Sequence, residues 1–181
     1  MTVAVQIPSR HTASTRGRSV LQPLFLAGAV AILAPVAIAL PITLVRGRPL
    51  PWQLQMPWVS PHLAVAMAAL TLGALQLGLK KGDRRHRLVG YAWCGLMAFI
   101  SLSGLLIQLQ PGQVSFIHQA SSVFSVINLI LLPLVIIGAR TGRPRLHRFA
   151  ALGMFATLLN AGALAFIPFR AVGSLVFGLF H

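Results

Sequence analysis

The chain has 181 residues, of which 56% are hydrophobic and 9% are charged. Ordinary globular domains have about a quarter of their residues charged, so this composition excludes a typical water-soluble fold. Fifteen residues are Lys or Arg, and Asp83 is the one acidic residue. With a single carboxylate, acid–base catalysis by paired acids is excluded, and cages of oxygen ligands for Ca²⁺ or Mg²⁺ are not expected.

The basic residues occur in short runs between apolar stretches and do not gather on one face of the predicted elements. Such runs are typical of loops beside a membrane, where anionic lipid headgroups neutralise them. We therefore expect a lipid bilayer with anionic headgroups, and not nucleic acid, to be the partner of these charges.

Five apolar stretches follow one another, each near the length of about 20 residues that a helix needs to cross a bilayer. A basic tail over residues 1–20 precedes the first transmembrane helix at 21–45. Four further spans, at 61–79, 88–109, 116–139 and 149–168, make up a four-helix core over residues 61–168. No alternating pattern predicts strands, so the expected fold class is an all-α membrane bundle. Residues 169–181 form a C-terminal tail that either extends the fifth helix or lies along the membrane interface.

The positive charges are distributed unequally between the two ends of the predicted spans. Twelve of the fifteen Lys and Arg residues lie in the N-terminal tail and in the loops after the second and fourth spans. The remaining three, Arg46, Arg48 and Arg170, lie on the opposite side. Because loops rich in Lys and Arg stay in the cytoplasm, this predicts a multi-pass protein of the bacterial inner membrane. Its N-terminus would be cytoplasmic and its C-terminus periplasmic.

The four-helix core has the pattern of one helix pair used twice. The first copy opens with Val-Ser and His62, and the second opens with Val-Ser and His118. The second helix of each copy begins with a His-Arg pair, at His86 and at His147. At 1.5 Å per helical residue, the two histidines within a copy are separated by about the thickness of a bilayer core. We therefore expect His62 and His118 near the outer surface, and His86 and His147 near the cytoplasmic surface.

Two histidines in each leaflet, supplied by alternate helices, are the arrangement that a bis-histidine haem site requires. The expected pairs are His62 with His118 and His86 with His147, and they predict binding of b-type haem. Iron bound by two protein ligands favours electron transfer, because no coordination position stays open. Each histidine lies near a helix N-terminus, where the helix dipole favours the neutral ring that can ligate a metal. Three cations are placed to meet the propionates of such a haem: Arg85, Arg87 and Arg148.

Other interpretations of the same residues remain open. Histidines flanked by arginine at a membrane interface also bind lipid phosphates and anchor a helix end. A small residue follows each histidine by four positions, on the same helix face, which either gives room for a flat cofactor or allows close helix packing. A zinc site is less well supported, because zinc requires three or four protein ligands. The small residues are Ala66, Gly90, Ser122 and Ala151.

Three short motifs resemble a family of bacterial predicted membrane proteins of unknown function. They are "HRLVGYAW" from His86, "GALQ" from Gly73 and "RLHRFAALGM" from Arg145. The resemblance covers residues 61–170, and its pattern is a histidine-opened helix, G-x-x-Q, HR-x-x-G and two further helices with a histidine each. The layout of the histidines is also similar to transmembrane cytochromes b and ferric-reductase-like proteins. The latter resemblance implies two haems that pass electrons across the membrane.

The sequence therefore leaves competing functions. The most specific is a b-type haem electron carrier, with a redox partner that the sequence does not identify. The alternative is a non-catalytic accessory or scaffold subunit of a larger membrane complex, which the small size and near absence of carboxylates favour. A small transporter or lipid-interacting protein is less well supported, because the predicted spans lack the charged residues that mark substrate paths. Four polar residues within the spans could line such a path, but hydrogen bonds between helices are the more common role: Gln76, Gln108, Asn128 and Asn160.

Overall fold

The structure is a computed structural model that describes the backbone of residues 21–110, 116–167 and 170–180. Side chains are described over the same ranges, except for residues 21, 116–121 and 180. Within these ranges every regular element is a helix, which confirms the all-α fold class. The elements are α1 (Leu21–Val45), η1 (Trp52–Gln55), α2 (Val59–Gly78), α3 (Arg84–Gln108), α4 (Phe116–Arg140), α5 (Pro144–Ala165), α6 (Ala171–Phe177) and η2 (Gly178–Phe180).

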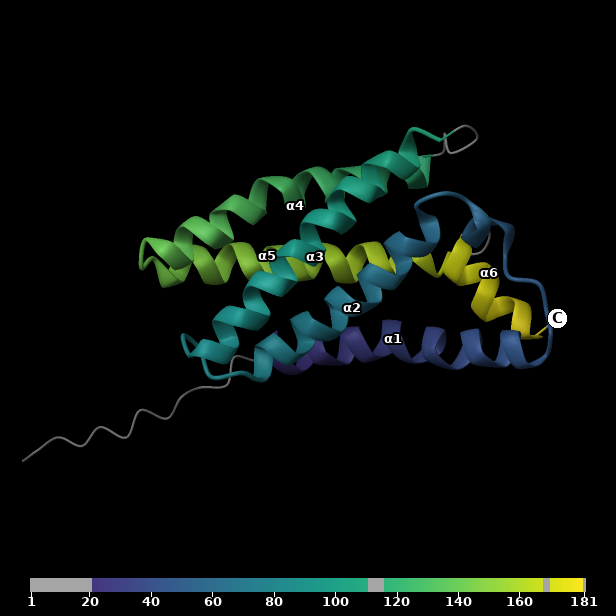
Figure 1. Ribbon diagram of the computed structural model, residues 1–181, viewed down its shortest axis with the longest axis horizontal. Helices are drawn as coiled ribbons and strands as arrows, with labels where there is room; N and C mark the ends of the chain where they lie inside the picture. The colour runs from purple at the N-terminus through teal and green to yellow at the C-terminus, as the bar shows by residue number, and fades with distance from the viewer. Residues whose placement is uncertain (1–20, 111–115, 168–169, 181) are drawn as a thin grey trace, which may run out of the picture.

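Five helices, α1 to α5, are long and apolar enough to cross a membrane, as predicted. They run side by side along the long axis of the molecule, and α6 packs beside α1 at one end (Figure 1). Each of α2, α3, α4 and α5 contacts the next helix in the chain, and α2 also contacts α5. Among the described residues, no Cα atom of α3 lies within 8 Å of α5, and none of α2 lies within 8 Å of α4. The four helices therefore form a ring in which α3 and α5 lie on one diagonal and α2 and α4 on the other.

The centre of the ring is closed by large apolar side chains at mid-height. The indole N–H of Trp93 on α3 donates a hydrogen bond to the carbonyl oxygen of Ala69 on α2 at 3.0 Å. Gly73, one turn further along α2, allows this approach. A Cβ atom there would overlap the Phe155 ring and lie 2.9 Å from Trp93 Nε1. The fully buried side chains around this point are Ala69, Met97, Ala150 and Met154.

Helices α3 and α5 begin about one turn earlier than their hydropathy predicts. The Asp83 carboxylate accepts a hydrogen bond from the backbone N–H of His86 at 2.7 Å, so Asp83 is the N-cap of α3. Pro144 stands in the first turn of α5, where its missing N–H costs no hydrogen bond. These two starting signals extend each helix into the basic loop. His86 and His147 consequently lie in the first turns of α3 and α5, and not in the loops.

The C-terminal segment does not continue the fifth helix. Helix α5 ends at Ala165, and α6 begins at Ala171 after a change in chain direction. Val172 and Leu175 of α6 are buried against Val36 and Ala39 of α1. The segment is therefore a separate short helix that packs on α1, and not an extension of the fifth helix.

Replacing Asp83 by alanine is expected to lower the free energy of unfolding by about 0.5–2 kcal/mol, the usual cost of losing an N-cap acceptor. Asp83→Asn is the matched control, because an asparagine oxygen caps equally well but carries no charge. Thermal unfolding in detergent measures both variants. If Asp83→Asn destabilises the protein as much as Asp83→Ala, the charge of Asp83 matters and its capping role is contradicted.

Candidate functional site

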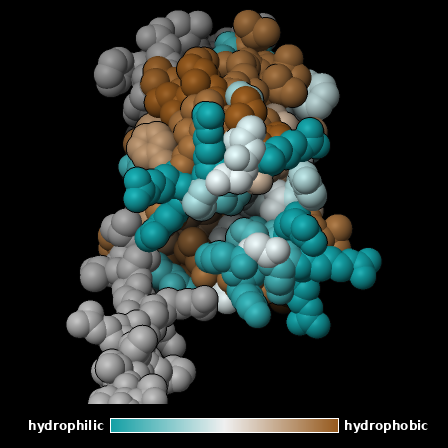
Figure 2. Space-filling view, turned by 90° about the vertical axis from the view of Figure 1, so that its left-hand side faces the viewer, coloured by the Kyte–Doolittle hydropathy of each residue, from teal (hydrophilic) through white to brown (hydrophobic). Residues whose placement is uncertain are grey.

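One end of the bundle, which we call the basic end, collects most of the positive charge. It contains the link between α2 and α3 and the link between α4 and α5. Nine Lys and Arg side chains are exposed here, and Asp83 is the one carboxylate. Figure 2 faces this end and shows hydrophilic side chains projecting from it beneath a hydrophobic body. The nine residues are Lys80, Lys81, Arg84, Arg85, Arg87, Arg140, Arg143, Arg145 and Arg148.

The structure brings His86 and His147 together at the basic end, as the sequence predicts. Their ring centroids are 6.2 Å apart, and the ring planes are inclined by 74°. Both side chains are half-buried. Because the backbones of α3 and α5 lie apart on one diagonal of the four-helix ring, the two imidazoles meet across the interior of the bundle.

The hydrogen bond of His147 fixes which ring nitrogen carries the proton. His147 Nδ1 lies 3.0 Å from the carbonyl oxygen of Val135 on α4. A carbonyl oxygen only accepts, so Nδ1 is the donor and Nε2 of the neutral ring keeps its lone pair. Gly138 allows this contact, since a Cβ atom there would lie 2.6 Å from the backbone nitrogen of His147. A histidine whose second nitrogen donates to a backbone carbonyl is typical of metal ligands.

Gln76 of α2 contacts His86 from the other side. Its Nε2 donates a hydrogen bond to the carbonyl oxygen of His86 at 2.8 Å and lies 3.1 Å from where a Cβ atom of Gly90 would be. Two atoms next to this contact, Gln76 Oε1 and His86 Nδ1, are buried and have no hydrogen-bond partner in the described part of the chain. A buried polar group without a hydrogen bond lowers the stability of a fold by about 1–3 kcal/mol, so a further partner for these two atoms would stabilise the site.

Positive side chains surround the pair without contacting it by any hydrogen bond in the described residues. Arg85, Arg87 and Arg148 are exposed around the two histidines. The Lys81 ammonium donates to the carbonyl oxygens of Gln76 and Leu77, at 2.7 and 3.1 Å, and so caps the end of α2. Burial and the nearby charge of Arg148 lower the pKa of Lys81 from its ordinary value. The basic end is therefore an electropositive rim in which an anion would find several unpaired cations.

The second predicted pair, His62 with His118, is not tested, because the side chain of His118 lies outside the described residues. His62 Nδ1 lies 2.9 Å from Ser103 Oγ, and this hydroxyl lies 2.7 Å from the Phe99 carbonyl oxygen, to which it donates. The ring therefore donates from Nδ1. It borders an apolar cavity of about 100 Å³ between α1, α2, α3 and α5. Drug-sized and cofactor-sized ligands occupy about 300–1,000 Å³, so this cavity is too small for a porphyrin.

The small residues next to the histidines have different surroundings. Gly90 is covered by the amide of Gln76, Ala151 packs against the buried core, and Ala66 lines the cavity beside His62. Small-residue packing therefore accounts for two of these three positions.

Asn128 joins two helices, as expected: Thr157 of α5 donates a hydrogen bond to Asn128 of α4 at 2.6 Å. Asn160 instead donates to the carbonyl oxygen of Ala156 within α5.

The number of side chains that could act as ligands limits which metal groups the site can hold. No group of three or more His, Cys, Asp or Glu side chains converges within the described ranges, so the zinc alternative gains no support there. Two imidazoles on opposite sides of one metal ion, each about 2 Å from it, have ring centres about 6 Å apart. The His86–His147 pair fits this separation. Haem iron receives its other four nitrogens from the porphyrin, so two histidines complete its coordination.

Sequence reasoning missed three groups that shape this site: the Val135 carbonyl, Gly138 and the orientation of Gln76. Only Gln76 could be found from the sequence, as an amide in an apolar span. It was predicted to form a hydrogen bond between helices, and it does so.

Comparison with known protein families, with curated proteins and with solved structures finds no match to this chain. The family resemblance of its motifs thus stays a prediction. The chain is an all-helical bundle with five helices that are long and apolar enough to span a membrane.

Proposed function

We propose that the protein binds one b-type haem between His86 and His147 and carries electrons at the cytoplasmic membrane. The observation that carries the proposal is that the two imidazole rings come from opposite helices of the four-helix ring and have centroids 6.2 Å apart. Edge-to-face packing of aromatic rings has the same separation, so distance alone is not decisive. The hydrogen bond of His147 favours ligation, because Nδ1 donates to the Val135 carbonyl oxygen and leaves Nε2 of the neutral ring unprotonated.

When bound, haem iron held by two imidazoles supplies one-electron transfer and leaves no open position for oxygen. The residues of the chain have separate tasks. The Val135 carbonyl orients His147, which is thereby held with Nε2 available as the ligand nitrogen. Gln76 Nε2 donates to the carbonyl oxygen of His86 and so holds the first turn of α3 against α2. Arg85, Arg87 and Arg148, which are exposed, would pair with the propionates of the haem.

The position of the pair also indicates where electrons enter or leave. His86 and His147 lie in the first turns of their helices, at the end of the bundle with nine basic side chains. The excess of Lys and Arg supports a cytoplasmic location for this end, with the N-terminus on the same side. A soluble redox partner with an acidic surface would dock against these charges. We confine the proposal to one haem, because the side chain of His118, the partner predicted for His62, lies outside the described residues.

The experiment that tests this function is a reduced-minus-oxidised absorption spectrum of protein purified in mild detergent from cells supplied with haem. We expect the Soret and α bands of a low-spin b-type haem, unchanged by carbon monoxide because both axial positions are occupied. A protein without these bands that co-purifies with stoichiometric membrane partners would contradict the haem proposal and favour the accessory-subunit alternative.

Replacing Gln76 by leucine is expected to lower the haem content of the purified protein about tenfold, a usual cost of losing a group that positions a metal ligand. Leucine removes the hydrogen bond from Gln76 Nε2 to the His86 carbonyl oxygen, which holds the first turn of α3 against α2. Gln76→Glu should lower the haem content similarly, because a carboxylate cannot donate this bond. Absorption of the purified variants, measured against protein, gives the haem content. Asn160→Leu is the control, since Asn160 is exposed and donates within its own helix. Equal haem content in all three variants would remove the positioning role of Gln76.

A further inference from the structure

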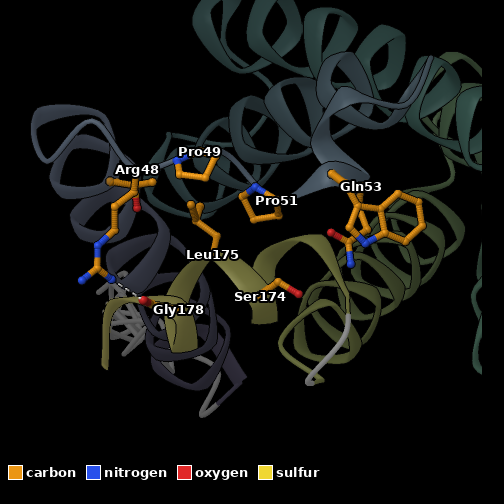
Figure 3. Close-up of a pocket in the computed structure, with 9 residues that line it drawn as sticks. Arg48, Pro49, Pro51, Gln53, Ser174, Leu175 and Gly178 are labelled. Atoms are coloured by element: carbon orange, nitrogen blue, oxygen red, sulfur yellow. Dashed lines mark hydrogen bonds between the residues drawn. The ribbon is translucent and has the colours of Figure 1, made fainter. Parts of the chain in front are cut away.

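A second cavity lies at the opposite end of the bundle, which we call the α6 end. It has a volume of about 510 Å³, within the range of ligand pockets. Its walls come from the end of α1, the link between α1 and α2, and α6 with the residue that follows it (Figure 3). The lining residues are Thr43, Arg48, Pro49, Pro51, Trp52, Gln53, Ser174, Leu175 and Gly178.

The charge of this end is positive and has no counter-charge among the described residues. Arg46, Arg48 and Arg170 lie here, whereas Asp83, the one acidic residue of the chain, lies at the basic end. Arg48 alone of the three lines the cavity. Its Nη1 donates a hydrogen bond to the carbonyl oxygen of Gly178 at 2.7 Å, which fixes the guanidinium against the end of α6 (Figure 3). A guanidinium has five N–H donors, so others remain for an anion in the cavity.

The other walls combine the Ser174 hydroxyl and the Trp52 indole with apolar surface. The hydroxyl of Ser174 makes no side-chain hydrogen bond with the described part of the chain and can donate to a ligand oxygen. Trp52 is 64% exposed, as is typical of aromatic side chains at the level of lipid headgroups. The prolines and Leu175 add apolar contacts. A ligand for this cavity therefore has a compact anionic part and lies at the boundary between water and lipid.

Apolar surface continues from the cavity along the outside of α1. Leu44, which follows the lining residue Thr43, is 57% exposed, and Val45 is 87% exposed. Phe177 of α6, next to the lining residue Gly178, is 46% exposed. Because α1 is a candidate span, this surface faces lipid when the helix lies in a membrane. An acyl chain can lie on it while its headgroup occupies the cavity.

We propose that the cavity at the α6 end binds the phosphate headgroup of an anionic phospholipid. The Arg48 guanidinium donates hydrogen bonds to the phosphate oxygens, as guanidinium groups commonly do. Ser174 donates to a second phosphate oxygen, and Trp52 packs against the glycerol part. The acyl chains lie along α1. The contact between Arg48 and Gly178 links the headgroup to α6, so bound lipid also fastens α6 to the rest of the bundle. This site is independent of the haem proposal.

Binding of phosphatidylglycerol to the delipidated full-length protein, followed by native mass spectrometry in detergent, tests the proposal. We expect Arg48→Gln to weaken binding about tenfold and Ser174→Ala about threefold. The matched control is Arg46→Gln, which removes the same charge two residues away, from a side chain that does not line the cavity. Arg46→Gln should leave the affinity unchanged. The thermal unfolding midpoint of each variant without lipid shows that the fold is retained.

Two comparison ligands separate the sources of the phosphate. Phosphatidylcholine, which has no net charge, should bind at least tenfold more weakly than phosphatidylglycerol. Glycerol 3-phosphate, which has the phosphate but no acyl chains, should compete only at concentrations at least a hundredfold higher. Equal loss of affinity in Arg46→Gln and Arg48→Gln would overturn the site in favour of diffuse charge attraction. Equal binding of the two lipids, or equally tight binding of glycerol 3-phosphate, would overturn the identity of the ligand.

Discussion

Replacing His147 by alanine is expected to abolish the low-spin haem spectrum of the purified protein, and His86→Ala should do the same. Each variant would remove one of the two ligands proposed for the haem. No third His, Cys, Asp or Glu side chain joins the pair within the described ranges, so no substitute ligand is at hand. Haem content, measured against protein by absorption after purification, should fall at least tenfold in both variants.

The matched control is His62→Ala, which removes a histidine from the other half of the bundle. His62 is held by Ser103 and borders a cavity of about 100 Å³, so we expect its loss to leave haem content unchanged. If His62→Ala abolishes the spectrum while His86→Ala and His147→Ala retain it, the haem has been assigned to the wrong end of the bundle.

Gly73→Ala is expected to destabilise the bundle by about 1–3 kcal/mol, although alanine is the better helix former. The new Cβ atom would overlap the Phe155 ring and lie 2.9 Å from Trp93 Nε1. Trp93 cannot retreat without losing its hydrogen bond to the Ala69 carbonyl oxygen. The thermal midpoint should fall by roughly 2–12 °C for a chain of this size.

Gly78→Ala is the control for this substitution, because it lies on the same helix, five residues away. A Cβ atom at Gly78 would meet nothing within 4 Å. We expect this variant to be neutral or stabilising by up to about 1 kcal/mol. Equal midpoints for the two alanine variants, measured by differential scanning fluorimetry in the same detergent, would contradict the close packing at Gly73.

The helices could be predicted from sequence because hydropathy alone determines which segments suit a membrane. Their first residues could not be predicted equally well, because helix starts depend on caps. The predicted third span began at residue 88, whereas α3 begins at Arg84 behind the Asp83 cap. An aspartate three residues ahead of His86 is a known starting signal, so this boundary was within reach of the sequence. The packing of α6 on α1 could not be predicted from the sequence, because it depends on a tertiary contact.

The pairing of His86 with His147 could be predicted, since alternate helices in a bundle run in the same direction and bring equivalent positions to the same end. The contacts that orient the rings could not. Whether Val135 or another carbonyl faces His147 depends on the rotation of α4 about its axis, which Gly138 permits through a backbone contact. A sequence that is apolar on most sides of a helix leaves this rotation undetermined.

The most direct measurement of the central claim is the ratio of haem b to protein chain in the purified wild-type protein. A pyridine haemochrome assay combined with amino-acid analysis gives this ratio. One haem per chain, with both axial positions occupied by imidazole in the electron paramagnetic resonance spectrum, is the predicted result. A protein isolated from haem-replete cells with fewer than one haem per ten chains would contradict it.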